Sequence, residues 1–126
     1  MNRAAISITA ALWLYLPFFV NAAVAINEVL FNPHQSNDTG LEKIELYNPE
    51  TAPLDISGWE LYPDGIGYFT FPNGFSLPAG SFVAIHLRTS GANNAANFYH
   101  PSAGVNMGNS SGSVAVFKPG VHGNDT

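Results

Sequence analysis

The stretch "IELYNPETAPLDISGWEL", residues 44–61, decides the fold of this chain. It opens with an alternating apolar run, which places Ile44 and Leu46 on the same face of a β-strand. Asn48 then stands before a proline, a pairing that favours extended or turn backbone and so ends the strand. After a loop comes Trp59, a large aromatic side chain that we expect to be buried between two sheets as a core anchor.

Three residues with small side chains explain the turn directly before the tryptophan. Gly58 permits a backbone conformation or a close approach that a side chain would forbid. Asp55 and Ser57 can hydrogen-bond to neighbouring backbone groups and so hold the turn. We therefore interpret residues 44–61 as a strand, a loop and a second strand, an architectural unit rather than a chemical one.

Short alternating runs recur through the rest of the chain, separated by turns rich in Pro and Gly. Strands are expected at residues 26–31, 42–48, 59–62, 67–71, 81–87 and 112–117. Turns are expected at 63–65, 72–74 and 78–80, where Gly follows Pro by two positions. Residues 89–111 read as a long loop, within which 93–99 could form one short helical turn. Strands this short, with turns this frequent, predict an all-β, Ig-like β-sandwich.

Residues 1–25 have the pattern of a cleavable signal peptide. Arg3 supplies the positive charge, residues 4–20 are almost all apolar, and Ala23-Val24-Ala25 is a small-x-small cleavage site. A retained membrane anchor is the alternative, and Pro17 argues against it. We therefore expect a domain at residues 26–120 and a polar tail at 121–126, in a protein that is secreted or located in the periplasm or cell envelope.

The charges of the expected mature chain exclude two classes of partner. All nine acidic residues follow position 25, but only three basic residues do, namely Lys43, Arg88 and Lys118. Nucleic-acid binders need clustered Lys and Arg, and anionic membranes also attract basic segments. We therefore expect no nucleic-acid partner, and no membrane partner after signal cleavage. The absence of cysteine also excludes disulfides, thiol nucleophiles and sulfur-ligated zinc.

Four segments, in order, carry a family resemblance. They are "INEVLFNP" at 26–33, "GLEKIELYNPETAPLDISGWELY" at 40–62, "FTFPNGFSLPAGSFVAIH" at 69–86 and "GNSSGSVAVFKPG" at 108–120. Together they resemble the lamin tail domain family, an Ig-like β-sandwich that also occurs in secreted bacterial proteins. The resemblance runs over nearly all of the expected mature chain.

This resemblance implies a non-catalytic module for protein interaction or structure, with another protein or an envelope component as partner. The alternative that it implies is an accessory or truncated fragment of a secreted nuclease or phosphoesterase. The family continues with at least one more apolar strand beyond the position of Gly120. We therefore expect either a truncated product or a sheet completed by a strand from another chain, including edge-strand association of identical copies.

One sequence pattern could be mistaken for a catalytic motif. Gly108 to Gly112 matches G-x-S-x-G, the nucleophile elbow, with Ser110 as the nucleophile. That elbow needs a strand before the serine and a helix after it. Here a loop precedes the serine and a predicted strand follows, so we interpret the match as accidental and predict that the protein is not an enzyme.

The remaining polar candidates do not form a recognisable site in the sequence. The histidines, at positions 34, 86, 100 and 122, lack metal-binding spacing and are expected to be packed or at the solvent edge. Two groups of carboxylates could bind calcium weakly but are expected to be solvated: Asp38, Glu42 and Glu45, and Asp55, Glu60 and Asp64. We therefore predict no catalytic residue, no cofactor and no metal ligand.

Overall fold

The computed structural model describes residues 23–33, 39–102 and 104–120. These residues form nine strands and no helix. The strands are β1 (Ala25–Leu30), β2 (Lys43–Tyr47), β3 (Leu54–Asp55), β4 (Glu60–Pro63), β5 (Phe69–Thr70), β6 (Ser76–Leu77), β7 (Phe82–His86), β8 (Asn97–Tyr99) and β9 (Val114–Phe117). Most of the predicted signal peptide and the tail at 121–126 lie outside the described residues. Within the described part, no helix is long and apolar enough to cross a membrane.

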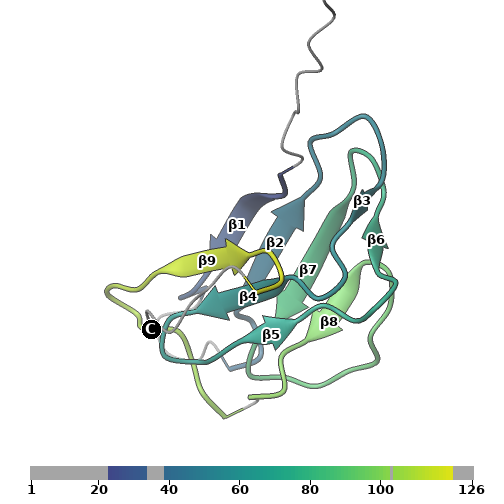
Figure 1. The fold of residues 1–126 in the computed structure, drawn as a ribbon. Coiled ribbons are helices and arrows are strands. Elements are labelled where there is room, and N and C mark those ends of the chain that lie inside the picture. Colours follow the sequence, from purple (N-terminus) through teal and green to yellow (C-terminus); the bar gives the residue numbers. More distant parts are fainter. Residues whose placement is uncertain (1–22, 34–38, 103, 121–126) are drawn as a thin grey trace, which may run out of the picture.

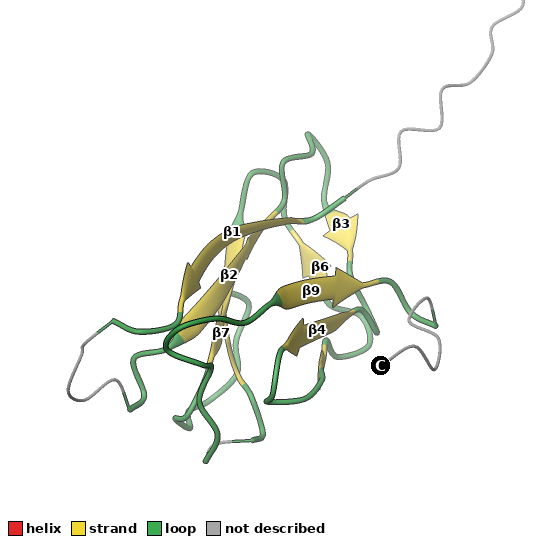
Figure 2. Cartoon of the chain, turned by 90° about the vertical axis from the view of Figure 1, so that its left-hand side faces the viewer, coloured by secondary structure: helices red, strands yellow, loops and turns green. Residues whose placement is uncertain are grey.

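The strands form two packed layers, as Figures 1 and 2 show. One layer is a four-stranded sheet of order β1-β2-β7-β8, antiparallel except where β8 runs parallel to β7. The other contains a three-stranded sheet of order β5-β4-β9, with a short β3-β6 ribbon beside it. The prediction of an all-β, Ig-like sandwich is confirmed.

The core lies between the layers and follows the alternation of the strands. Ile44 and Leu46 of β2 are fully buried, opposite Ile85 and Val83 of β7. Leu61 of β4 is fully buried in the same cluster. An aromatic group packs in or against this core: the rings of Phe69, Phe71, Phe75 and Phe98 lie with centroid separations of 4.9 to 5.7 Å. The inward face predicted for β2 is therefore confirmed.

Asn48 closes the β2 strand with a fully buried side chain. Its amide nitrogen donates to the carbonyl oxygens of Ala52, Leu77 and Pro78 at 2.9 to 3.1 Å. Its amide oxygen accepts the backbone N–H of Glu50 at 2.9 Å. A single side chain thus ties its own loop to the end of β6 and the residue after it, which explains why a polar residue can be buried here.

The turn before Trp59 has the predicted hydrogen bonds. Asp55 Oδ1 accepts both the backbone N–H and the hydroxyl of Ser57, and Ser57 Oγ in turn accepts the N–H of Gly74 at 2.9 Å. The bonds from the hydroxyl and then the backbone N–H of Ser57 lower the pKa of Asp55 below its usual value, because they favour the ionised carboxylate. Gly58 has φ of +69°, a conformation that other residues rarely adopt.

Trp59 departs from its predicted place in the core. It is half-buried, lies just before β4, and packs against the edge of the core cluster rather than within it. The Lys118 ammonium lies 5.6 Å from the centroid of its ring, over the aromatic face. Trp59 directly follows a turn, and its indole ring lies partly in solvent. Phe71, not Trp59, occupies the centre of the core.

The predicted turns are present, but two segments differ from their predicted structure. The three Pro-Gly turns form as predicted, each closed by a bond to the carbonyl of its proline. The short β3-β6 ribbon was not predicted, because two residues are too few for alternation to be recognised. Residues 93–99 form no helical turn: β8 begins at Asn97, since the side chain of Asn94 accepts the backbone N–H groups of Ala96 and Asn97 and orders the approach to the strand.

Candidate interaction surface

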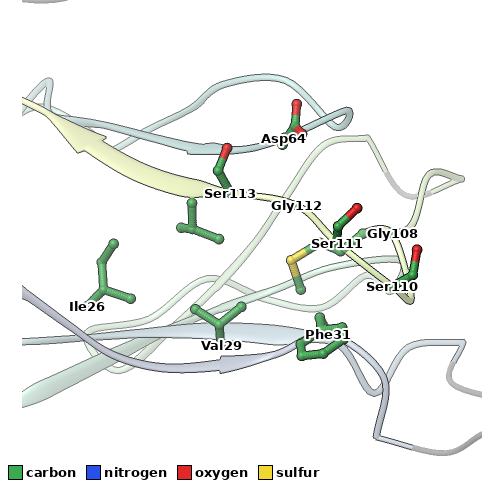
Figure 3. A pocket seen from close by; sticks show the side chains of 11 residues that line it. Ile26, Val29, Phe31, Asp64, Gly108, Ser110, Ser111, Gly112 and Ser113 are labelled. Carbon is green, nitrogen blue, oxygen red and sulfur yellow. The ribbon is translucent and has the colours of Figure 1, made fainter.

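An open groove of about 410 Å³ lies along one side of the sandwich, between β1 and the segment that leads into β9. Its walls are apolar side chains on β1 and small polar residues on the opposite segment (Figure 3). The apolar lining consists of Ile26, Val29, Phe31, Met107 and Val114. The remainder consists of Gly108, Gly112, Asp64 and the serines 110, 111 and 113.

A β-bulge brings the apolar side chains of β1 to the same face. Alternation alone places Val29 and Phe31 on one face and Ile26 on the other. The register of β1 against β2 shifts at Asn27, so that Ile26 lies opposite Leu46 and Val29 lies opposite Ile44. Because both partners point into the core, Ile26 and Val29 also face inward.

These inward-facing side chains are nevertheless exposed, which shows that the core is uncovered here. Ile26 is 40% exposed although it lies opposite a fully buried leucine, and Phe31 at the end of β1 is 43% exposed. On the other layer, Val114 and Val116 are only half-buried, whereas their partners on β4 are buried. The core is therefore closed over the middle strands and open at the β1 and β9 edges.

The far wall of the groove depends on a tight loop. At Gly108 a side chain would place its Cβ only 2.6 Å from the carbonyl oxygen of Ser111, so only glycine fits. The preceding Met107 is buried and donates its backbone N–H to the carboxylate of Glu42 at 3.2 Å. This bond fixes the start of the loop to the four-stranded sheet. The serines that follow in the loop are exposed.

Ser110 lies in this exposed loop and not at a strand-to-helix elbow. The residues before it are irregular, and β9 follows it at Val114. The loop and strand predicted around the serine are therefore confirmed. A nucleophile elbow instead holds its serine on a sharp turn between a strand and a helix.

Two of the four histidines lie in the described residues, and both are packed as predicted. His86 on β7 bonds through Nε2 to Asn97 Oδ1 at 2.8 Å, and its ring stacks on Tyr99. His100 is buried, with Nδ1 accepting the N–H of Ser102 and Nε2 lying 3.1 Å from the carbonyl of Gly67. Positions 34 and 122 lie outside the described residues.

The carboxylates do not converge on one point, and one of them contradicts the prediction. Glu42 is fully buried beneath the loop that carries Met107, so the expectation of a solvated side chain was wrong there. Glu45 is half-buried on the outer face of β2, where it accepts a bond from Asn27 at 2.7 Å. Asp38 lies outside the described residues. Within them, no group of three His, Cys, Asp or Glu could hold a metal ion.

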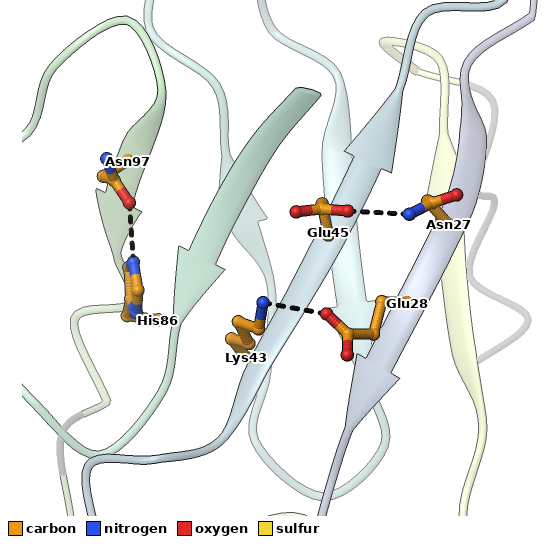
Figure 4. Close-up of polar contacts among 6 residues, drawn as sticks. All are labelled: Asn27, Glu28, Lys43, Glu45, His86 and Asn97. Carbon is orange, nitrogen blue, oxygen red and sulfur yellow. Dashed lines mark hydrogen bonds and ion pairs between the residues drawn. The ribbon is translucent and has the colours of Figure 1, made fainter. Parts of the chain in front are cut away.

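The outer face of the four-stranded sheet carries side chains that pair with one another, and Figure 4 shows the polar pairs. Lys43 forms a 2.8 Å ion pair with Glu28, and the hydrogen bond in that pair raises the pKa of Lys43. Phe82 stacks on Tyr47 at a centroid distance of 4.6 Å and remains 46% exposed. The side chains of this face therefore find partners among themselves, whereas the apolar side chains of the groove stay exposed.

The burial of His100 makes stability depend on pH. Desolvation lowers the pKa of the folded-state imidazole below the value of about 6.5 in an unfolded chain. As the pH falls below about 6.5, the unfolded chain binds the proton first. We therefore expect the free energy of unfolding to decrease from pH 7.5 to pH 5 and to level off below the folded-state pKa.

Urea unfolding of the protein and of His100→Gln at half-unit pH steps measures this effect. The variant can still donate to the carbonyl of Gly67 but carries no titratable ring, so its unfolding free energy should change less over the same range. An equal slope in both proteins would assign the pH dependence to other groups.

The comparisons with known proteins agree with this architecture. The family model described as "Lamin Tail Domain" matches residues 19–125, most of the chain. A search of curated proteins found no match. The matched family consists of Ig-like domains of the protein-interaction type, in keeping with the two-layer sandwich and its open edge. On the extent of that match and on its fold, the chain belongs to the lamin tail domain family.

Proposed function

We propose that this protein is an exported, non-catalytic interaction domain whose partner is another protein or an envelope component. The observation that carries the proposal is the exposure of inward-facing side chains in the groove, chiefly Ile26 and Phe31. Soluble proteins rarely leave contiguous apolar surface at a core edge unless something binds there. The family supports the same function, since its domains are of the interaction type.

In-cell crosslinking tests this function. The full chain, carrying a C-terminal tag, is produced in its host, and a short amine-to-carboxylate crosslinker is added before fractionation. We expect one adduct of defined mass in the medium or envelope fraction, and a Phe82→Ser variant should give the same adduct. A protein recovered only inside the cell, or only without an adduct, contradicts the proposal.

The non-catalytic part of the proposal has its own assay. Ser110 stands in an exposed loop with a strand after it, and no helix begins at that strand. We expect no turnover of ester, phosphomonoester, phosphodiester or nucleic-acid substrates above buffer. Turnover that Ser110→Ala abolishes would show that the protein is an enzyme.

The position of signal cleavage is also open to measurement. We expect cleavage before Val24 rather than after Ala25, because Val24 packs against the core and Ala25 pairs with Tyr47 in β1. A protein beginning at Ile26 loses both contacts and should be less stable by about 1 kcal/mol than one beginning at Val24. Intact-mass measurement of the exported protein and urea unfolding of the two forms check this, and equal stability would contradict it.

A further inference from the structure

We infer that the groove is completed by an extended segment of a different protein, which pairs with the free edge of β9 and carries alternating apolar side chains and basic residues. The inference rests on the proposed interaction function and specifies its site and partner chemistry. Three features support it: the direction of the free backbone groups on β9, the apolar floor beneath them, and the sign of the charge.

The first feature is the direction of the backbone groups of β9. The backbone N–H of Asp64 donates to the carbonyl of Ser113 at 2.9 Å, so these two residues form a hydrogen-bonded pair next to β9. Antiparallel pairs alternate, so the pair of Pro63 with Val114 is not hydrogen-bonded, which fits the missing N–H of proline. The N–H and C=O groups of Val114 and Val116 therefore point away from β4.

Those groups point to the edge that remains open. In the described part of the chain, β9 pairs with β4 alone and β1 pairs with β2 alone. β1 is a poor template for a further strand, because the bulge at Asn27 breaks the regular spacing of its free groups. β9 pairs with β4 without a register shift and so presents a regular edge. A strand added to β9 extends its sheet over the groove.

The second feature is the apolar floor that such a strand would cover. Ile26, Val29 and Phe31 line the groove, and Figure 3 shows them on the side opposite Ser113. A strand paired with β9 turns every second side chain toward this floor. Alternating apolar residues in the partner therefore bury Ile26 and Phe31, as peptides do when they add a strand to a sheet edge.

The third feature is charge, and it selects a different protein over a second copy. The groove is lined by one carboxylate, Asp64, and by no Lys, Arg or His among the described residues. The whole chain has a net charge of −5, so two copies that meet at this edge repel one another. A partner segment with Lys or Arg near the exposed Asp64 is attracted instead.

A display library of random ten-residue peptides, selected against the full folded chain, tests the inference. We expect the enriched peptides to alternate apolar residues and to contain an excess of Lys and Arg. A synthetic copy of the best peptide should bind Phe31→Ser at least tenfold more weakly than the unchanged protein. Phe31 is 43% exposed, so this variant is expected to fold, which its thermal melting checks.

Matched controls separate groove binding from general stickiness. Phe82→Ser changes a similarly exposed phenylalanine, 46% exposed on the outer face of the four-stranded sheet and away from the groove, and should leave the affinity unchanged. Methylating alternate backbone nitrogens of the peptide removes donors for β9 and should weaken binding at least tenfold. Selection against Asp64→Lys should remove the preference for basic peptides.

Four results would overturn the inference. They are a library without peptides that depend on Phe31, full binding by the N-methylated peptide, selected peptides without basic residues, and a homodimer that Phe31→Ser converts to monomer. The last would make a second copy the occupant. Peptides or crosslinked partners that depend on Phe82 instead would leave the interaction function intact and remove only the groove as its site.

Discussion

Phe71→Ala is expected to lower the free energy of unfolding by about 3–5 kcal/mol, a large part of the stability of a domain of this size. Phe71 is 1% exposed, and its ring contacts those of Phe69, Phe75 and Phe98 at once. Removing the ring leaves a cavity that three aromatic neighbours on different segments cannot fill. Urea unfolding followed by tryptophan fluorescence and far-ultraviolet circular dichroism measures the loss.

The control for this prediction is an exposed phenylalanine. Phe82→Ala removes the same side chain from a site that is 46% exposed and stacked only on Tyr47, so we expect a loss of about 1 kcal/mol. Half-buried Trp59 is expected to lie between the two, at about 2 kcal/mol for Trp59→Ala. A loss at Trp59 that exceeds the loss at Phe71 would show that the indole is the central core residue after all.

Asn48→Asp is expected to lower the free energy of unfolding by about 3–5 kcal/mol at neutral pH, although it changes only one group of the side chain. The amide nitrogen of Asn48 donates to three backbone carbonyl oxygens in a fully buried site. An aspartate places a carboxylate oxygen against these acceptors, so their bonds are lost and a charge is buried with only the backbone N–H of Glu50 as its donor. Chemical unfolding at pH 7 measures the loss.

Asn73→Asp supplies the matched control, because Asn73 is exposed in the turn between β5 and β6. The same chemical change there should alter the free energy of unfolding by no more than about 0.5 kcal/mol. Similar losses at the two positions would mean that the Asn48 bonds contribute little, and that the end of β2 is held by the chain around it.

The sequence predicted the fold well where the pattern was long enough to read. Five residues of alternation at 43–47 were sufficient to assign the inward face of β2, and the Pro-Gly turns identified places where the chain turns between strands. Pairs as short as β3 and β6 carry no period, so only tertiary packing defines them. The inward orientation of Ile26 could not be predicted either. It depends on a bulge, and a bulge is set by the pairing with the neighbouring strand rather than by the local sequence.

The candidate site was less predictable than the fold. The exposure of Ile26 and Phe31 depends on which strands lie at the sheet edges, and edge order is not written in local sequence. The burial of Glu42 was missed for a similar reason, since its partner Met107 is more than sixty positions away. Phe31 next to the polar residues 32–40 was the one local signal that an apolar side chain ends its strand near solvent.

The central position of β2 has a consequence for how the chain reaches this structure. Leu46 pairs on one side with Ile26 and on the other with Val83, so the middle of the four-stranded sheet joins segments from both halves of the chain. The long loop between Leu46 and Val83 must close before most of the stabilising contacts form. All-β topologies with such distant pairings fold in about milliseconds to seconds. During that interval the apolar strands are exposed to solvent and to other unfolded chains, and stopped-flow refolding would time it directly.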